Sequence, residues 1–141
     1  MALKITLKPG EKFVINGAVV VNADRRTSLL IQNKVSILRE KDVMLPTEAN
    51  TPVKRIYFDV MMMYLDDAAQ GHFMADFTQR MTEFMDAISN REALQKCVSI
   101  VEDVNAGRFY GALMTCKKLL PFEKERLEYV GPREPLSAAS S

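Results

Sequence analysis

Tryptophan is absent from the 141 residues, histidine occurs once, at His72, and cysteine occurs twice. A single histidine excludes a metal site built on a histidine pair, and no serine stands in a nucleophile motif. The sequence also lacks G-x-x-x-x-G-K-S/T and G-x-G-x-x-G, the glycine-rich patterns that cradle nucleotide phosphates. We therefore expect a protein that binds rather than catalyses, with no cofactor and no metal, and we place His72 at the surface or at a helix cap.

Long hydrophobic runs are missing too. The most apolar stretch, residues 56–65, is interrupted by Asp59 and is shorter than the roughly 20 apolar residues that span a bilayer. No basic segment followed by an apolar run of signal-peptide length opens the chain. Cys97 and Cys116 stand at apolar positions of expected helices, which favours reduced cysteines packed in the core over a disulfide. We expect a cytoplasmic protein that does not enter the membrane.

A large net charge of either sign is also absent, since the formal charge is +1. The charge is unevenly distributed, because residues 1–55 carry ten Lys and Arg against five acidic residues, and the remainder carries nine against thirteen. The two parts therefore have net charges of +5 and −4. This asymmetry favours contact between the first part and a phosphate-bearing partner. Ordinary fluctuation of surface charge is the alternative.

Alternating residues and turn signals fill the first 40 positions. Residues 3–8 alternate apolar and polar side chains, as in a half-buried strand. Asn16-Gly17 lies between the apolar segments 13–15 and 18–21 and predicts a tight β-hairpin. Further strands are expected over residues 28–32 and 35–39. So many short strands in succession predict a small antiparallel barrel or sandwich.

Helical periodicity replaces the strand pattern after Pro46. Residues 48–52 form the expected junction, with Asn50 or Thr51 capping a helix that begins near Pro52. Apolar residues at spacings of three and four predict helices over 72–89 and 92–104, the second followed by Gly107 as a C-cap. A last helix is expected over 109–120, ended by Pro121.

These patterns predict an α+β protein in which a small antiparallel β barrel or sandwich precedes a helical module. We assign residues 1–50 to the β module and 51–128 to the helical module. Residues 129–141, which contain two prolines and end in Ser and Ala, are expected to form a disordered tail.

Basic residues of the β module are the candidates for binding RNA. Lysine neutralises phosphate, and arginine also stacks on bases or bonds them through two parallel N–H groups. Solubilising charge on the outer face of a sheet is the alternative explanation. The candidate RNA-binding residues are Lys4, Lys8, Arg25, Arg26, Arg39 and Lys41.

Methionine is abundant, with nine residues, three of which are consecutive. The thioether side chain is flexible and polarisable, so a methionine cluster suits an adaptable groove for a partner helix. Filling of the core is the alternative. The candidate partner-binding residues are Met61, Met62 and Met63.

Several blocks of sequence together resemble one known family. They are Leu7-Lys8-Pro9-Gly10-Glu11-Lys12, Asn16-Gly17-Ala18-Val19, Ile37-Leu38-Arg39-Glu40-Lys41-Asp42-Val43-Met44, Ala49-Asn50-Thr51-Pro52 and Arg55-Ile56-Tyr57-Phe58. With Gly107, Phe109-Tyr110 and Leu119-Leu120, they resemble the FlbT family of flagellin regulators, over most of the chain from Leu3 to Glu123.

The resemblance implies a non-enzymatic regulator that acts after transcription in a flagellated bacterium. Proteins of this family act at the 5′ untranslated region of flagellin messenger RNA and lower its translation and lifetime, although some relatives activate instead. They typically work with a small companion protein, FlaF. The resemblance therefore implies two partners, the flagellin mRNA leader and a FlaF-like protein.

The β module also resembles the RNA-binding protein CsrA, in which an early strand leads to Gly-Glu and a late strand carries Arg-Glu. The matching residues here are Gly10-Glu11 and Arg39-Glu40, while Leu7 stands where CsrA has a second basic residue. This resemblance implies that Lys8 and Arg39 grip a single-stranded, GGA-like loop, with Arg39 in contact with the RNA. It also suggests a homodimer, because open sheet edges gain from pairing.

Two functions are consistent with the sequence. The first is an RNA-binding repressor of flagellin translation that also promotes decay of the message. The second is an adaptor or chaperone-like factor that binds FlaF or flagellin through the methionine-rich helices and acts on RNA only indirectly.

Overall fold

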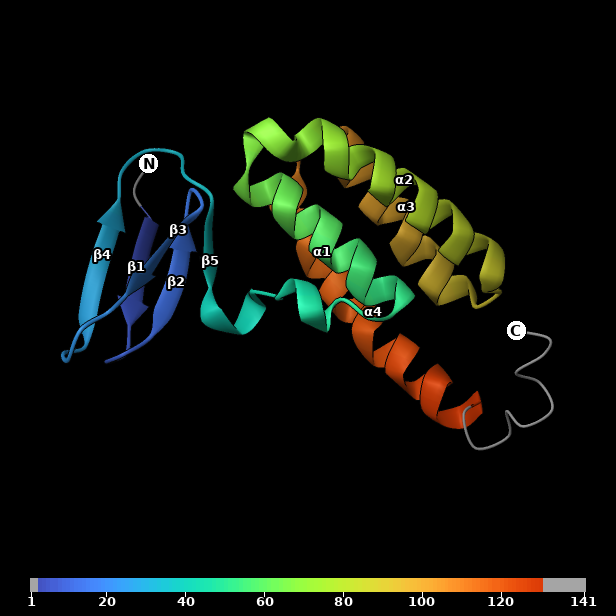
Figure 1. Ribbon diagram of the computed structural model, residues 1–141, viewed down its shortest axis with the longest axis horizontal. Coiled ribbons are helices and arrows are strands. Elements are labelled where there is room, and N and C mark those ends of the chain that lie inside the picture. The colour runs from blue at the N-terminus through green and yellow to red at the C-terminus, as the bar shows by residue number, and fades with distance from the viewer. Residues whose placement is uncertain (1–2, 131–141) are drawn as a thin grey trace.

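The computed structural model describes residues 3–130, with side chains described as far as Leu127. A β module at one end of the molecule is followed by four helices at the other (Figure 1). This arrangement confirms the predicted α+β class. In the described part of the chain, no helix is both long and apolar enough to cross a membrane.

Five antiparallel strands form two small sheets. Strand β1 (Leu3–Leu7) pairs with β4 (Thr27–Ile31) in one sheet. The second sheet has the order β3-β2-β5, from β2 (Lys12–Ile15), β3 (Ala18–Val21) and β5 (Ile37–Arg39). The predicted hairpin is confirmed: Ile15 pairs with Ala18 around a two-residue turn in which Asn16 and Gly17 have φ angles of 48° and 86°. Positive φ at both positions is the signature of a type I′ turn.

The two sheets pack face to face on a small core of Ile5, Leu7 and Phe13. Neighbouring residues of a strand point to opposite faces of its sheet, so Val14 and Leu38, which pair across β2 and β5, face away from this core. Leu38 is only 1% exposed and belongs to the core of the helical module. The three-stranded sheet is therefore covered by the β1–β4 sheet on one face and, at β5, by helices on the other.

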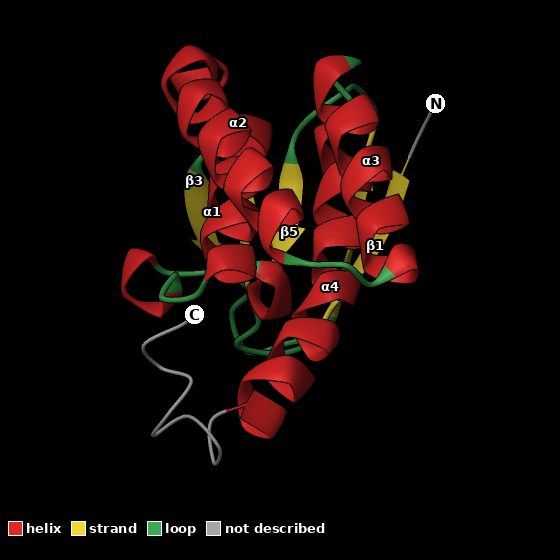
Figure 2. Ribbon diagram, turned by 90° about the vertical axis from the view of Figure 1, so that its right-hand side faces the viewer, coloured by secondary structure: helices red, strands yellow, loops and turns green. Residues whose placement is uncertain are grey.

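The helical module consists of α1 (Pro52–Leu65), α2 (Gln70–Ala87), α3 (Arg91–Asn105) and α4 (Phe109–Val130). Helices α1 and α4 pack against each other in the middle, α2 packs on α1, and α3 packs on α4. Figure 2 looks onto the helices and shows α2 and α3 on opposite sides of the module. Short 3-10 turns lie in the connections, at Glu40–Asp42 and Pro46–Glu48 between β5 and α1 and at Asp67–Ala69 between α1 and α2.

Both cysteines lie in the helical core. Cys97 and Cys116 are free thiols with no exposed surface, as the sequence predicted. Burial raises the pKa of Cys97 to about 11 and also raises the pKa of Cys116. Both therefore act as small apolar packing groups rather than as reactive thiols.

The predicted helix caps are confirmed at two positions. Thr51 precedes α1, and its hydroxyl accepts a hydrogen bond from Lys54 N at 3.3 Å. Gly107 follows α3 with a φ of 78°. Its N–H donates to Val104 O at 3.1 Å, and Arg108 N donates to Asp103 O at 2.8 Å. This pair of bonds is the Schellman motif, which requires the left-handed backbone that glycine adopts without strain.

The prediction that Pro121 ends the last helix is wrong, because α4 continues to Val130. The first two residues of the expected tail, 129 and 130, belong to this helix, and residues 131–141 lie outside the described part of the chain. Glu123, two residues beyond the proline, is 6% exposed. Its carboxylate accepts hydrogen bonds from the Thr51 hydroxyl at 2.5 Å and from Val53 N at 2.9 Å. This anchor to the start of α1 offsets the hydrogen bond that proline cannot donate.

We expect Glu123→Ala to lower the free energy of unfolding by about 1–3 kcal/mol, because it leaves the buried Val53 N–H without an acceptor. Urea unfolding followed by circular dichroism measures the change. Glu125→Ala is the matched control, since Glu125 is exposed on the same helix. Equal effects of the two substitutions would show that the anchor does not hold α4 in place.

A buried ion pair joins α1 to α2. Asp59 has no exposed surface, and Arg80 Nη1 lies 2.8 Å from each of its carboxylate oxygens. Burial raises the pKa of Asp59 from 3.8 to about 6, although the hydrogen bonds and charge of Arg80 lower it in part. Between pH 3.8 and about pH 6, Asp59 therefore keeps its proton in the folded protein but has lost it in the unfolded chain.

Asp59 should make the protein less stable as the pH rises from about 4 to about 6, because proton release then favours the unfolded chain. We expect Asp59→Asn to gain stability relative to the parent over this range. Urea unfolding at several pH values gives the difference, with Asp86→Asn, an exposed site on α2, as control. A difference that is independent of pH would contradict the raised pKa.

Candidate nucleic-acid interface

The outer face of the β1–β4 sheet carries three of the candidate cations. Ile5 and Leu7 point inward, so Lys4 and Thr6 of the same strand point outward. In the register of the sheet, Lys4 is opposite Leu30 and Thr6 is opposite Ser28, with the two hydroxyl oxygens 3.4 Å apart. The register ends with the pair Leu7 and Thr27, and the exposed residues Lys8 and Arg26 directly adjoin this pair. We call this surface the outer face, formed by Lys4, Thr6, Lys8, Arg26, Ser28 and Leu30.

Asn22 fixes one end of the outer face. Its side-chain amide donates to Lys8 O at 2.7 Å and to Arg25 O at 2.8 Å, which holds the backbone after β1 beside the backbone before β4. The Thr27 hydroxyl also donates to Arg25 O, at 3.0 Å. Lys8, Arg25 and Arg26 are all exposed around this cluster of bonds. Asn22 was not among the predicted site residues, because its only signal in the sequence is an asparagine in an expected loop.

Arg39 is bonded within the β module and is not part of the outer face, although 39% of its side chain is exposed. Its Nε donates to Glu11 Oε2 at 2.9 Å, and its Nη2 donates to Glu11 Oε1 at 3.0 Å and to Thr6 O at 2.7 Å. Glu11 also accepts from Lys8 N at 2.9 Å. The bond from the Lys8 N–H, followed by the bonds from Arg39, lowers the pKa of Glu11.

These contacts change the role that the sequence suggested for Arg39. Its side chain crosses from β5 to the backbone of β1 and so ties the two sheets together. Glu11 accepts from Arg39 and from the backbone N–H of Lys8, and no contact joins the side chains of Lys8 and Arg39 among the described residues. Two of the three guanidinium nitrogens of Arg39 are already bonded within the module. We therefore assign Arg39 to the fold. Lys41 is exposed in the turn after β5 and is not part of the outer face.

The three consecutive methionines do not form an exposed docking surface. Met61 is 3% exposed and Met63 is 0% exposed, because α1 is covered by α2, α4 and the segment after β5. Met61 Sδ accepts a hydrogen bond from Met44 N at 3.3 Å. Only Met62 is partly exposed. The prediction of partner-binding residues is therefore wrong for Met61 and Met63, which fill the core.

His72 lies at the surface near the start of α2, 3.8 Å from Asp76. This placement agrees with the surface role that the sequence indicated. Among the described residues, no group of three or more His, Cys, Asp and Glu side chains is arranged to hold a metal ion.

The fold defines a small α+β protein in which the outer face, with its three cations, is not covered by any other described element. The family described as "Flagellar protein FlbT" matches residues 3–127. The chain belongs to this family.

Three relatives show the range of similarity. The "Flagellum biosynthesis repressor protein FlbT" of Caulobacter vibrioides is 52% identical over 130 residues, which cover 92% of each chain. A "Probable flagellum biosynthesis repressor protein FlbT" of Rhodopseudomonas palustris is 38% identical, over 90% of this chain and 98% of its own. A "Probable flagellum biosynthesis repressor protein FlbT" of Brucella anthropi is 31% identical, over 97% of this chain and 90% of its own. No solved structure was found to match this protein.

If Arg39 serves the fold, Arg39→Ala and Glu11→Ala should each lower the free energy of unfolding, and the double variant should lose less than the sum of the two single losses. Urea unfolding of the four proteins measures this coupling. Lys41→Ala is the control, since Lys41 is exposed and two residues away. If Arg39→Ala keeps full stability and weakens RNA binding, Arg39 belongs to the RNA surface instead.

Proposed function

We propose that this protein represses flagellin synthesis after transcription by binding the 5′ untranslated region of flagellin mRNA. The bound message is translated less and decays sooner. Relatives that are named repressors of flagellum biosynthesis support the regulatory part of this proposal. The outer face supports the RNA part.

The composition of the outer face is the observation that carries the proposal. Its six residues comprise three cations, two hydroxyl groups and one leucine, and none of them is acidic. Lysine and arginine neutralise phosphates, and the hydroxyls of Thr6 and Ser28 offer further hydrogen bonds to the RNA backbone. Leu30, which is 63% exposed, offers an apolar contact to a base.

The shape of this surface favours a single strand. A sheet face with projecting lysines accepts unstacked nucleotides, whereas the deep major groove of an RNA helix is closed to side chains. Lys4 and Lys8 are four residues apart, or about 13 Å along an extended strand. Lys4 and Lys8 therefore follow the direction of β1, along which an extended RNA segment places its phosphates, and Arg26 adjoins the neighbouring strand β4.

The rival function, an adaptor that binds FlaF or flagellin through Met61 to Met63, is less well supported. Two of these three side chains are buried. A FlaF-like companion or a second copy of the chain remains compatible with the proposal, provided that it uses other surfaces.

We expect a Lys4→Ala, Lys8→Ala, Arg26→Ala triple variant to bind a flagellin leader RNA less tightly and with a weaker dependence on salt. For a single strand, the slope of log affinity against log salt should become less negative by about 2, which corresponds to about 0.7 per lost phosphate contact. Filter binding over a range of salt concentrations measures this slope.

The matched control removes three cations from the helical module, with Lys96→Ala, Lys118→Ala and Lys124→Ala. This variant should bind the leader almost as the parent does. Direct RNA recognition is ruled out if the parent binds no leader RNA at low salt. The outer face is ruled out as the RNA-binding surface if the control variant loses as much affinity as the Lys4, Lys8, Arg26 triple variant.

A further inference from the structure

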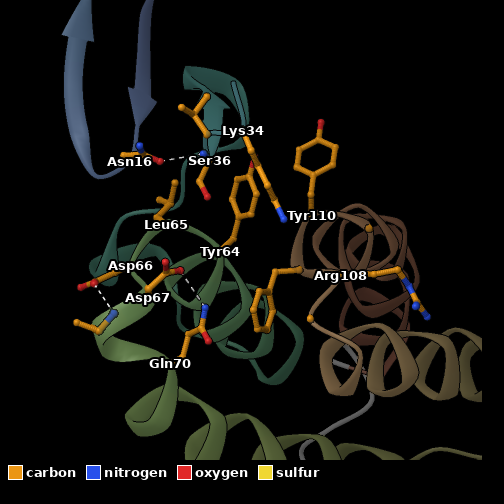
Figure 3. Close-up of a pocket in the computed structure, with 15 residues that line it drawn as sticks. Asn16, Lys34, Ser36, Tyr64, Leu65, Asp66, Asp67, Gln70, Arg108 and Tyr110 are labelled. Atoms are coloured by element: carbon orange, nitrogen blue, oxygen red, sulfur yellow. Dashed lines mark hydrogen bonds between the residues drawn. The ribbon is translucent and has the colours of Figure 1, made fainter. Parts of the chain in front are cut away.

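A cleft of about 860 Å³ opens where the β module meets the helices. One wall comes from the β module, with Asn16 at the hairpin tip and residues 34–36 before β5. The end of α1 and the following turn, residues 64–68, form the second wall, and residues 107–111 at the start of α4 form the third (Figure 3). The cleft is separate from the outer face and contains none of its residues.

Hydrogen bonds fix the walls of this cleft. The Tyr64 hydroxyl accepts from Ile37 N and donates to Ile37 O, both at 2.9 Å. Asn16 Oδ1 accepts from Ser36 N at 2.9 Å, and Asn16 N donates to Ser36 O at 2.8 Å. The cleft is therefore formed in advance, so a ligand would not have to order its walls.

An exposed aromatic ring stands at the mouth of the cleft. Tyr110 is 46% exposed, and its ring centroid lies 5.5 Å from that of Tyr64. The turn at Gly107 and the first residues of α4 hold its backbone. An exposed ring on a rigid helix, supported from behind by a second ring, is a platform on which a nucleobase can stack.

Lys34 supplies a cation beside this ring. Its side chain extends toward Tyr110 (Figure 3), and it forms no ion pair with the described residues. Lys34 follows β4, which ends at Ile31 opposite Leu3. The connection to β5 therefore leaves the β1–β4 sheet at the end that carries Lys4 (Figure 1). An RNA strand that runs along the outer face from Lys8 past Lys4 reaches the end of the sheet from which the connection to Lys34 departs.

Two carboxylates line the second wall and restrict what can enter. Asp66 Oδ1 accepts from Ala68 N at 3.0 Å, and Asp67 Oδ1 accepts from Gln70 Nε2 at 3.1 Å. The other oxygen of each carboxylate makes no hydrogen bond with the described residues. These groups repel phosphate but accept hydrogen bonds from the amino groups of adenine, cytosine and guanine, whereas uracil has no amino group.

We propose that this cleft takes one unstacked, amino-bearing nucleobase from the RNA strand that crosses the outer face. The base stacks on Tyr110, its phosphate lies against Lys34, and its amino group points toward Asp66 and Asp67. The inference rests on the proposed function and adds to it a site of base selection.

The test measures the affinity of the full chain for the flagellin leader and for short single-stranded oligonucleotides of A, C or U. Tyr110→Ala should weaken leader binding about tenfold, and Tyr110→Phe, which keeps the ring, should change it less than about twofold. Lys34→Gln should weaken binding about threefold, while the control Lys118→Gln, at an exposed site on α4, should not. Thermal unfolding of each variant confirms that it is folded.

Base selection is read from the same oligonucleotides. The parent should prefer A and C over U, and the double variant Asp66→Asn, Asp67→Asn should lose this preference. A parent that binds U as tightly as A and C overturns the inference.

Failure of this inference differs from failure of the proposed function. If Tyr110→Ala binds the leader like the parent while the Lys4, Lys8, Arg26 triple variant does not, the cleft is excluded and the outer face stands. The cleft is also excluded if Tyr110→Ala abolishes binding of a protein partner and leaves RNA affinity unchanged. If the parent binds no RNA, both proposals are rejected.

Discussion

Strand β5 is the constraint on which the rest of the structure depends, because its three residues serve both halves of the molecule. Leu38 inserts into the helical core, while the neighbouring Ile37 packs against the core between the sheets. The Tyr64 hydroxyl bonds both the N–H and the C=O of Ile37, which occupies backbone groups that an edge strand would otherwise leave open. The β module is thereby fixed at one orientation to α1. This orientation turns the β1–β4 sheet away from the helices and creates the cleft at the junction.

The internal ion pair of the β module explains how its cations are divided. Arg39 and Glu11 neutralise each other and bond the backbone of β1, so they connect the sheets and add no charge to the surface. Lys4, Lys8 and Arg26 have no such partner among the described residues and stand on the outer face, which no other described element covers. Part of the positive charge of residues 1–55 therefore lies on an exposed surface that a polyanion can reach.

Features set by near neighbours could be predicted from the sequence, and features set by distant contacts could not. The Asn16-Gly17 turn, the Thr51 cap and the Gly107 cap follow from a few adjacent residues, and all three are present. Pro121 carries the local signal for a helix end, which the bonds from Glu123 to the start of α1 override across 70 residues or more. Met61 and Met63 looked available only because the sequence does not show that α1 is the covered helix. The role of Arg39 depends likewise on Glu11, 28 positions away.

The outer face and the cleft differ in what they can contribute to recognition. Contacts between lysines and phosphates supply affinity that is nearly independent of sequence and that salt weakens. A repressor directed at one class of message also needs a contribution to the binding free energy that depends on the bases. A flat sheet face with one exposed leucine supplies little of this contribution. In the proposed mode of binding, the cleft with its aromatic ring and two carboxylates would supply this base-dependent contribution through stacking and hydrogen bonding. The cleft lies at the junction between the modules, and residues of both modules line it. Selectivity would therefore depend on the contact between Tyr64 and β5, whereas general affinity for RNA would depend only on the β1–β4 sheet.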